Sequence, residues 1–328
     1  MKLTILGAGA WGTALSAHWA DAHQVMLWGR NAAELDAMRV HRVNARYLPD
    51  CPLPEALVLQ PDFDAAAEAA ELIVVSVPSH GLRATLEALA KRPALPPLIW
   101  VCKGFETGSG KLPHQLVADI LPTHTQTGVL SGPSFALEVA RGYPTALTLA
   151  STDTALAQRL AEALSGQRLR IYAHDDVTGV EIGGALKNVM AIAAGICDGL
   201  QLGHNARAAL ITRGLAEMTR LGVRLGGHFE TFMGLSGLGD LILTTTGDLS
   251  RNRRVGLKLA RGEALDAILA ELGHVAEGVT TAREVDTLAG QLGVDMPITR
   301  AVCRILYGAL PAAQAVDALL NREIKSEF

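Results

Sequence analysis

The sequence predicts an α/β protein, with an N-terminal doubly wound sheet followed by an all-α C-terminal domain. Up to about residue 180, short apolar runs alternate with alanine-rich stretches of helical period. This pattern is typical of a parallel sheet covered by helices on both faces. After residue 180 the apolar runs disappear and helical periods take over. We therefore expect two domains, residues 1–180 and residues 181–328.

The composition limits the class of protein. A chain of 328 residues with 49% hydrophobic content exceeds what one compact core usually holds. A net charge of -4 gives no reason to expect nucleic acid or a membrane surface as a partner. The four cysteines are widely spaced and form no CxxC, which indicates free thiols in a reducing compartment. No signal peptide fits the N-terminus and no apolar run approaches membrane-spanning length, so we expect a cytoplasmic protein.

The expected elements follow from these patterns. Strands are predicted at residues 3–6, 25–28, 72–77, 98–102, 128–132, 145–150 and 169–172. A helix is predicted directly after the first strand, at residues 13–20. In the second domain, helices are predicted at residues 181–197, 205–225, 252–261, 264–272, 280–292 and 297–308.

The turn after the first strand reads Gly7-Ala8-Gly9-Ala10-Trp11-Gly12, a GxGxxG motif between a strand and a helix. In this context the first glycine permits a tight turn, the second admits a pyrophosphate against the backbone, and the third lets helix and strand pack closely. The helix N-terminus faces the phosphate charge. A glycine turn without a ligand is the alternative. The second strand, at the expected distance, favours Rossmann-type dinucleotide binding by residues 7–12.

The end of the second strand bears on which dinucleotide binds. An NAD-selective site usually has an acidic residue there to hold the ribose 2′-hydroxyl. This sequence has Trp28-Gly29-Arg30-Asn31 instead, and the next carboxylate is Glu34. Arg30 is therefore predicted to face a 2′-phosphate, with a solvated surface arginine as the alternative. We expect NADP(H) as cofactor, with NAD(H) also used.

Polar residues follow three later strands, where ligands of open α/β sheets bind. Val77-Pro78-Ser79-His80 follows one strand, and Lys103, between Cys102 and Gly104, follows the next. Lys103 is predicted either at a cleft rim or at the start of a surface loop. The stretch 131–136, with Gly132 and Ser134, is again strand, Gly-Pro turn and helix. It suits an anion or a sugar hydroxyl, although an ordinary helix entry has the same composition.

The helix expected at residues 181–197 contains Lys187 and Asn188 among apolar and small residues. Ile182, Leu186, Val189, Ala193 and Ile196 form a packing stripe, and Lys187 points roughly opposite to it. The face around Lys187 lacks side-chain bulk, so a flat cofactor ring or another backbone can approach it. Partial burial of the lysine would favour proton transfer near neutral pH. A close-packed helix whose lysine extends to water is the alternative.

Two later stretches carry charge. Asp240 lies in the otherwise apolar run Gly237-Leu238-Gly239-Asp240-Leu241-Ile242-Leu243-Thr244 and needs a cation if it is buried, for which Lys187 is the candidate. Residues 250–254, SRNRR, place three arginines around a predicted helix start with Ser250 as N-cap. Arginine side chains and helix N–H groups together suit a phosphate or carboxylate, and a solvated basic turn is the alternative.

Together these motifs resemble the bacterial soluble NAD(P)-dependent glycerol-3-phosphate dehydrogenases, and the likeness covers nearly the whole chain. The motifs that carry it, in order, are GAGxWGTALS, VPSH, CKG, SGPSFA, GGALKNVMAIAAG, NARAALITRGLAEM, GLGDLILT, SRNRR and VAEG. The resemblance implies a Rossmann domain joined to an all-α domain of the 6-phosphogluconate-dehydrogenase type. It also implies reduction of dihydroxyacetone phosphate to sn-glycerol 3-phosphate for phospholipid synthesis.

The resemblance also implies roles for individual residues. Lys187 resembles the family's proton donor and acceptor, with Asn188, Asp240 and Thr244 lining the same site. Residues implied at the substrate are Lys103, Gly132, Ser134, Ser250, Arg251 and Asn252. Residues implied at the cofactor, besides the glycine-rich turn, are Arg30, Lys103, Ala136, Arg251, Val275 and Glu277. One departure is visible, because Ala10 stands where many members have serine and so lacks a hydroxyl near the pyrophosphate.

We therefore expect hydride transfer to the keto carbon of a three-carbon phosphate, with protonated Lys187 supplying the hydroxyl proton. The alternatives are a 3-hydroxyacid or 6-phosphogluconate-type dehydrogenase and a non-catalytic NADP(H)-sensing protein. The GLGD and SRNRR stretches favour the glycerol phosphate function. No metal is expected, because the ten histidines form no HExxH or clustered carboxylate pattern. The sequence leaves the oligomeric state open, with a homodimer as one alternative.

Overall fold

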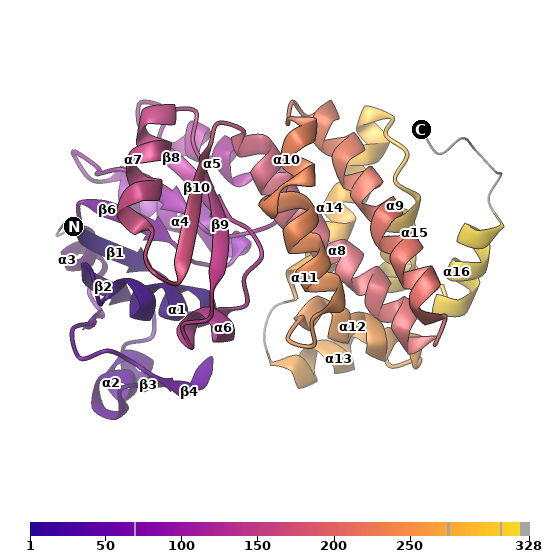
Figure 1. The fold of residues 1–328 in the computed structure, drawn as a ribbon, viewed down its shortest axis with the longest axis horizontal. Helices are drawn as coiled ribbons and strands as arrows, with labels where there is room; N and C mark the ends of the chain where they lie inside the picture. Colours follow the sequence, from indigo (N-terminus) through magenta and orange to yellow (C-terminus); the bar gives the residue numbers. More distant parts are fainter. Residues whose placement is uncertain (69, 274–275, 309, 322–328) are drawn as a thin grey trace. The chain divides into compact units, whose positions relative to one another are not determined.

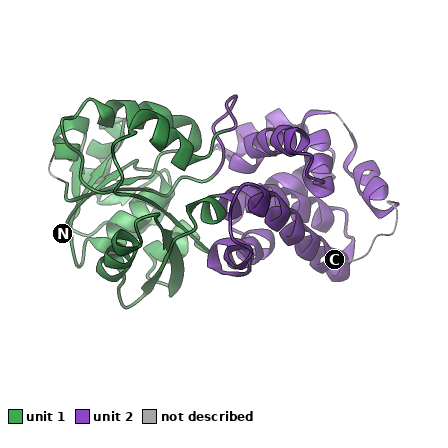
Figure 2. Cartoon of the chain, turned by 90° about the horizontal axis from the view of Figure 1, so that it is seen from above, with its two compact units in different colours: residues 1–103, 111–181 green, residues 104–110, 182–328 purple. Residues whose placement is uncertain are grey.

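The computed structural model describes residues 1–68, 70–273, 276–308 and 310–321. It divides into two compact units, coloured separately in Figure 2: residues 1–103 with 111–181, and residues 104–110 with 182–328. The segment 104–110 lies within the second unit, where the Gly108 N–H donates to Glu284 over 3.1 Å. The division between residues 181 and 182 falls inside one continuous helix, α8 (Val177–Gly199).

The first unit is built on an eight-stranded sheet with the order β10-β9-β8-β7-β6-β1-β2-β5. Its strands are β1 (Lys2–Leu6), β2 (Gln24–Trp28), β5 (Val58–Gln60), β6 (Leu72–Val75), β7 (Leu98–Trp100), β8 (Thr127–Ser131), β9 (Thr145–Ala150) and β10 (Leu169–His174). All seven strands expected from the sequence are present. Two elements were not expected: the short edge strand β5, and a separate hairpin of β3 (Val43–Asn44) and β4 (Leu48–Pro52).

The predicted doubly wound sheet is present, with one departure from the parallel pattern. β8 and β9 pair antiparallel, with Leu130 opposite Leu149, while the other pairs in the sheet are parallel. A parallel neighbour needs a long crossover connection, usually a helix. The connection from β8 to β9 holds only the five-residue helix α6 (Ala136–Ala140). Apolar periodicity shows that a strand is buried but does not show its direction.

Each central strand contributes side chains to two separate cores, one on each face of the sheet. Leu72 and Val74 belong to one core, while Ile73 and Val75 belong to the other. The first core includes side chains of α1 (Ala10–Trp19), α2 (Ala32–His41) and α7 (Thr154–Leu164). The second includes side chains of α3 (Phe63–Glu68), α4 (Ser79–Ala90) and α5 (Pro113–Ile120). Both faces are therefore covered, as a doubly wound fold requires (Figure 1).

Among its described residues, the second unit contains helices and turns but no strand (Figure 1). Besides α8 it contains α9 (Gly203–Arg224), α10 (Phe229–Met233), the π-helical turn η1 (Leu235–Gly239), α11 (Asp240–Thr246), α12 (Arg251–Ala260), α13 (Leu265–Leu272), α14 (Glu277–Leu292), α15 (Pro297–Tyr307) and α16 (Ala312–Leu320).

Helix α8 is the central helix of this unit, and residues 181–197 are all buried. Glycines allow other elements to approach it closely. A methyl group added at Gly183 would lie 2.3 Å from the Ser236 carbonyl oxygen of η1, and one at Gly195 would lie 2.0 Å from the Arg253 carbonyl oxygen of α12. By length and composition alone α8 would pass as a membrane span, so the expectation that no apolar run approaches this length was wrong. Its apolar window is wholly buried, as in the core helix of a soluble domain.

Candidate active site

The glycine-rich turn has the geometry that a dinucleotide pyrophosphate needs. Gly7 has φ +128°, and a methyl group there would lie 2.5 Å from the Ser76 carbonyl oxygen. A methyl group at Gly12 would lie 2.0 Å from the Gly7 carbonyl oxygen, whereas one at Gly9 would meet nothing within 4 Å. Gly9 is the N-cap of α1, where no side chain caps the free N–H groups. The turn thus combines close packing at two glycines with open space at the third, beside a helix N-terminus.

The end of β2 exposes Arg30 and leaves the nearest carboxylate engaged. Asn31 caps α2 by accepting from the Ala33 and Glu34 N–H groups over 3.1 and 3.3 Å. The Glu34 carboxylate accepts from Arg46 over 2.8 Å. Arg30 is exposed. The arrangement is therefore compatible with a 2′-phosphate at Arg30, because Glu34, the next carboxylate along the chain, already pairs with Arg46.

Two more of the expected site segments meet in the first unit. The Lys103 ammonium donates to the Gly132 carbonyl over 3.3 Å, and the Ser134 hydroxyl donates to the same oxygen over 3.1 Å. Lys103 and Ser134 are half-buried, and Gly132 has φ +140°. Ala10, Trp11 and Ala136 pack against one small apolar cluster between α1 and α6. Residues expected at the substrate and at the cofactor are thus grouped within this unit.

In the second unit, the expected pairing of Lys187 with Asp240 is confirmed. The Lys187 ammonium donates to the carboxylate of Asp240, whose side chain is fully buried, while 8% of the lysine side chain is exposed. Thr244, one turn along α11, donates its hydroxyl to the Asp240 carbonyl over 2.6 Å. The ammonium therefore has a counterion inside a largely dry environment, which holds it in one place.

Among the small residues around Lys187, Gly183 and Gly195 serve helix packing. The sequence left open whether a cofactor ring or another backbone uses that face. At Gly183 and Gly195 the neighbour is protein backbone, from η1 and α12. The same holds at Gly278, where a methyl group would lie 2.6 Å from the Asn188 carbonyl oxygen. These glycines bring the helices close enough for polar side chains of different helices to meet.

Asn188 and Asn252 connect three helices. The Asn252 amide nitrogen donates to the Asn188 side-chain oxygen over 2.9 Å, and the Asn252 side-chain oxygen accepts from the Gly278 N–H over 3.0 Å. Gly278 lies in the first turn of α14, whose own N-cap, Ala276, has no side-chain hydrogen bond. Asn252 therefore supplies the missing acceptor at that helix start. Both asparagines are buried.

The arginine-rich turn is only partly as expected. Ser250 is the N-cap of α12, accepting from the Arg253 N–H over 3.2 Å, as predicted. The structure separates the three arginines of this turn, and the predicted anion site at Arg251 stays a prediction. Arg253 donates internally to Asp198 and Asp248, whereas Arg251 and Arg254 are exposed. Of the cofactor residues implied in this unit, Glu277 is half-buried as the first residue of α14, and Val275 lies outside the described residues.

One buried cluster was missed by sequence reasoning. Glu181 accepts from Trp100 over 2.8 Å and from the His114 N–H and ring over 2.9 and 2.5 Å. Burial raises the pKa of Glu181, and its hydrogen bond and charge outweigh the effect of burial to raise the pKa of His114. These residues lie 67 and 81 positions apart, so no local pattern links them. Among the described residues, no group of three or more potential ligands could hold a metal.

The fold and these sites define a nicotinamide-dependent dehydrogenase: a dinucleotide-binding sheet followed by a helical unit with a buried Lys–Asp pair. Residues 2–182 match the model of the NAD-dependent glycerol-3-phosphate dehydrogenase N-terminus, and residues 176–317 match that of its C-terminus. The chain therefore belongs to the NAD-dependent glycerol-3-phosphate dehydrogenase family, a family of oxidoreductases.

Individual relatives agree with this assignment. The chain is 77% identical to an NAD(P)+ glycerol-3-phosphate dehydrogenase of Thiobacillus denitrificans and 59% identical to that of Dechloromonas aromatica, each over the full length of both chains. The crystal structure of glycerol-3-phosphate dehydrogenase from Coxiella burnetii superposes with a TM-score of 0.93 at 43% identity, covering 98% of this chain and 99% of that one. The yeast glycerol-3-phosphate dehydrogenase superposes with a TM-score of 0.82 at 28% identity, covering 97% and 98%.

Proposed function

We propose that this chain catalyses the reversible reduction of dihydroxyacetone phosphate to sn-glycerol 3-phosphate with NADPH, and also with NADH. The observation that carries the proposal is the buried pair of Lys187 and Asp240 in a chain of this family. The pair is an acid/base group held in place, which a non-catalytic NADP(H)-sensing protein would not require. The turn at residues 237–240 and the arginine-rich turn at 250–254 favour the glycerol phosphate function over a 3-hydroxyacid or 6-phosphogluconate-type dehydrogenase.

The dinucleotide is assigned to the glycine-rich turn of the first unit. Residues 7–12 would hold its pyrophosphate, with Arg30 at the ribose 2′-phosphate and Trp11, Lys103 and Ala136 nearby. The family resemblance also implies Arg251, Val275 and Glu277 as cofactor residues. When bound, the reduced nicotinamide supplies a hydride to the keto carbon. The chain itself orients the substrate and manages the proton.

Lys187 is assigned as the proton donor in reduction and the acceptor in oxidation. As the keto carbon is reduced, negative charge develops on its oxygen, and a nearby ammonium both stabilises that charge and supplies the proton. Asp240 keeps the ammonium in position. Thr244 and Asn188 complete the same polar group, since Thr244 bonds to Asp240 and Asn188 follows Lys187 on α8.

The substrate phosphate is assigned to the start of α12. Arg251 is exposed there, and the N-terminus of a ten-residue helix favours an anion. Asn252 uses one of its two amide hydrogens toward Asn188, which leaves the second for the phosphate. Ser250 stabilises the turn as N-cap, and Lys103, Gly132 and Ser134 are assigned to the substrate from the first unit.

The test compares turnover by the wild type and by Lys187→Ala, with turnover measured as the loss of NADPH absorbance. We expect wild-type turnover with dihydroxyacetone phosphate and none with 3-keto acids. The variant should lose about 10²- to 10⁴-fold in kcat, the usual contribution of a positioned acid/base group, yet still bind NADPH. Near-normal kcat in the variant would refute the role of Lys187. If the wild type binds NADPH tightly but turns over none of these substrates, the result would favour a non-catalytic NADP(H)-sensing protein.

We further infer a cytoplasmic enzyme that supplies glycerol 3-phosphate for phospholipid synthesis. Its partners would be the phosphorylated substrate and the dinucleotide, without nucleic acid or membrane, consistent with the mild negative charge. None of the four cysteines forms a disulfide, which is consistent with a reducing compartment. A homodimer stays a prediction, which sedimentation velocity at several protein concentrations would test.

A further inference from the structure

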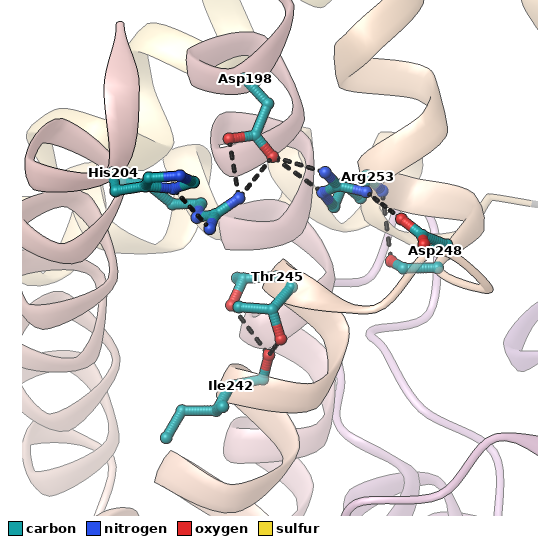
Figure 3. Close-up of polar contacts among 9 residues, drawn as sticks. Asp198, His204, Ile242, Thr245, Asp248 and Arg253 are labelled. Atoms are coloured by element: carbon teal, nitrogen blue, oxygen red, sulfur yellow. Dashed lines mark hydrogen bonds and ion pairs between the residues drawn. The ribbon is translucent and has the colours of Figure 1, made fainter.

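Asp198, near the C-terminal end of α8, is the centre of an ion-pair cluster that joins three helices of the second unit. It pairs with Arg253 of α12 and with Arg207 of α9. Figure 3 shows the Arg253 side chain with the carboxylate of Asp198 on one side and that of Asp248 on the other. Sequence reasoning gave no role to Asp198, and the reaction proposed above does not use it.

The contact between Asp198 and Arg253 is a two-point interaction with limited access to water. The Arg253 Nε and Nη2 groups both donate to Asp198 Oδ2, over 2.9 and 2.7 Å. The side chains of Asp198 and Arg253 are 15% and 12% exposed. Hydrogen bonds between ionised groups are strong, and two of them fix the orientation of a guanidinium as well as its distance. By contrast, Asp248 reaches Arg253 over 3.0 Å with a side chain that is 97% exposed.

This ion pair is one of several contacts that fix the start of α12 against α8. Asn188 and Asn252 form a hydrogen bond at one end, and Asp198 and Arg253 form the ion pair at the other. Between them Gly195 faces the Arg253 carbonyl, and a methyl group at Gly256 would lie 2.0 Å from the Ile192 carbonyl oxygen. Asn252, Arg253 and Gly256, which follow Arg251 on α12, are therefore held against α8, and this determines where the exposed side chain of Arg251 starts.

We propose that Asp198 is a positioning residue for the phosphate-binding turn: by holding Arg253, it fixes the backbone from which Arg251 and Asn252 reach the substrate phosphate. The inference rests on the proposed function, because it concerns the same phosphate. An alternative role for Asp198 predicts the opposite change in phosphate binding. If Asp198 only neutralised Arg253, removing its charge would release a second arginine to the anion and strengthen binding.

The test compares Asp198→Asn with Asp248→Asn, two isosteric changes at carboxylates that share Arg253. Steady-state kinetics at saturating NADPH would give kcat and KM for dihydroxyacetone phosphate. Inhibition by inorganic phosphate would probe the anion site alone. For Asp198→Asn we expect KM and the phosphate inhibition constant to rise together by about ten-fold or more, with kcat nearly unchanged, because small misplacements of binding groups are costly. For Asp248→Asn we expect both constants to change by less than about two-fold, because an exposed ion pair is weak.

A second set of variants separates positioning from a loss of folding. Arg253→Met should raise KM as Asp198→Asn does. The double variant Asp198→Asn/Arg253→Met should have a KM no higher than that of either single variant, because both changes remove the same contact. Thermal unfolding would be measured on all four variants. A KM for Asp198→Asn that is unchanged or lower would overturn the inference, as would a lowered unfolding temperature with unchanged KM. Additive effects in the double variant would also contradict it.

Failure of the inference is distinguishable from failure of the proposed function. Wild-type turnover of dihydroxyacetone phosphate decides the function, and the ratio of variant to wild-type KM decides the role of Asp198. If the wild type does not turn over this substrate, both proposals fall. If it does and Asp198→Asn behaves like Asp248→Asn, only the role of Asp198 is lost.

Discussion

Asp240 of α11 is fully buried and forms an ion pair with Lys187 of α8, 53 residues earlier in the chain. Neither group would be stable there alone, because an unpaired charge in a dry environment is strongly unfavourable. The pair therefore links the fold of the helical unit to its proposed chemistry. The two contributions can be separated by changing one partner or both.

We expect Asp240→Ala to destabilise the protein by about 3–5 kcal/mol, since it leaves a buried ammonium without a counterion. The double variant Lys187→Met/Asp240→Leu should regain most of that stability, because it replaces the pair with apolar groups, yet it should have no turnover. Urea unfolding and NADPH oxidation would be measured on the same preparations. A double variant as unstable as Asp240→Ala would argue against this origin of the destabilisation.

We expect Arg30→Ala to weaken NADPH more than NADH, because only NADPH carries the 2′-phosphate that Arg30 is proposed to face. The KM for NADPH should rise by about ten-fold, the equivalent of a charge-assisted hydrogen bond of about 1.4 kcal/mol, while that for NADH stays nearly constant. Arg46→Ala is the matched control, because Arg46 is also exposed but pairs with Glu34. A preference for NADPH that survives Arg30→Ala would place the phosphate elsewhere.

Gly9 and Gly12 should respond differently to alanine. At Gly12 the methyl group would lie 2.0 Å from the Gly7 carbonyl oxygen, so Gly12→Ala should destabilise the first unit by about 1–3 kcal/mol. At Gly9 the methyl group enters open space and φ is -75°, so Gly9→Ala should fold normally. It should still weaken dinucleotide binding, because the methyl group occupies the space proposed for the pyrophosphate. Unfolding curves and NADPH titrations would check both statements, and equal NADPH affinity in wild type and Gly9→Ala would contradict the second.

Glu217 of α9 should make stability fall as pH rises. Its carboxylate accepts from the Ile298 and Thr299 N–H groups at the start of α15, over 2.6 and 3.1 Å. Burial nonetheless raises the pKa of Glu217 from 4.5 to about 7. The folded state therefore holds this proton more tightly than the unfolded state does. The free energy of unfolding should decline between about pH 4.5 and 7, by roughly 3 kcal/mol from this group alone.

Glu217→Gln tests this dependence. Glutamine has no charge to gain, so the variant should lose this part of the pH dependence, while any lost hydrogen bond lowers its stability equally at every pH. Urea unfolding at several pH values from 4.5 to 8 would compare the two slopes. Parallel profiles for wild type and variant would show that Glu217 is ionised alike in the folded and unfolded states.

Much of the fold follows from local patterns. The seven predicted strands are present because each is a short apolar run between turns. β5 was missed because its three residues, Val58–Gln60, end in a polar side chain and include only one buried residue. The hairpin β3–β4 was missed because its second strand contains two prolines, which are unusual in strands. The antiparallel direction of β9 could not be predicted, because burial on both faces gives the same pattern for parallel and antiparallel strands.

The candidate site likewise has a part that could be predicted from the sequence and a part that could not. The pairing of Lys187 with Asp240 was predictable because a buried carboxylate needs a cation and one lysine stood in an apolar helix. The fate of the three arginines was not predictable. Arg251, Arg253 and Arg254 are chemically alike, and Asp198, which engages Arg253, lies 55 residues away.

The sequence by itself determined the alternation of elements, the glycine-rich turn, the N-cap at Ser250 and the need of Asp240 for a cation. These are properties of neighbouring residues or of one side chain's solvation. The tertiary structure alone decided which helices approach at Gly183, Gly195 and Gly278, and which arginine is held by Asp198. Those outcomes depend on helices whose backbones are in close contact, and the residues that meet there are far apart in the chain.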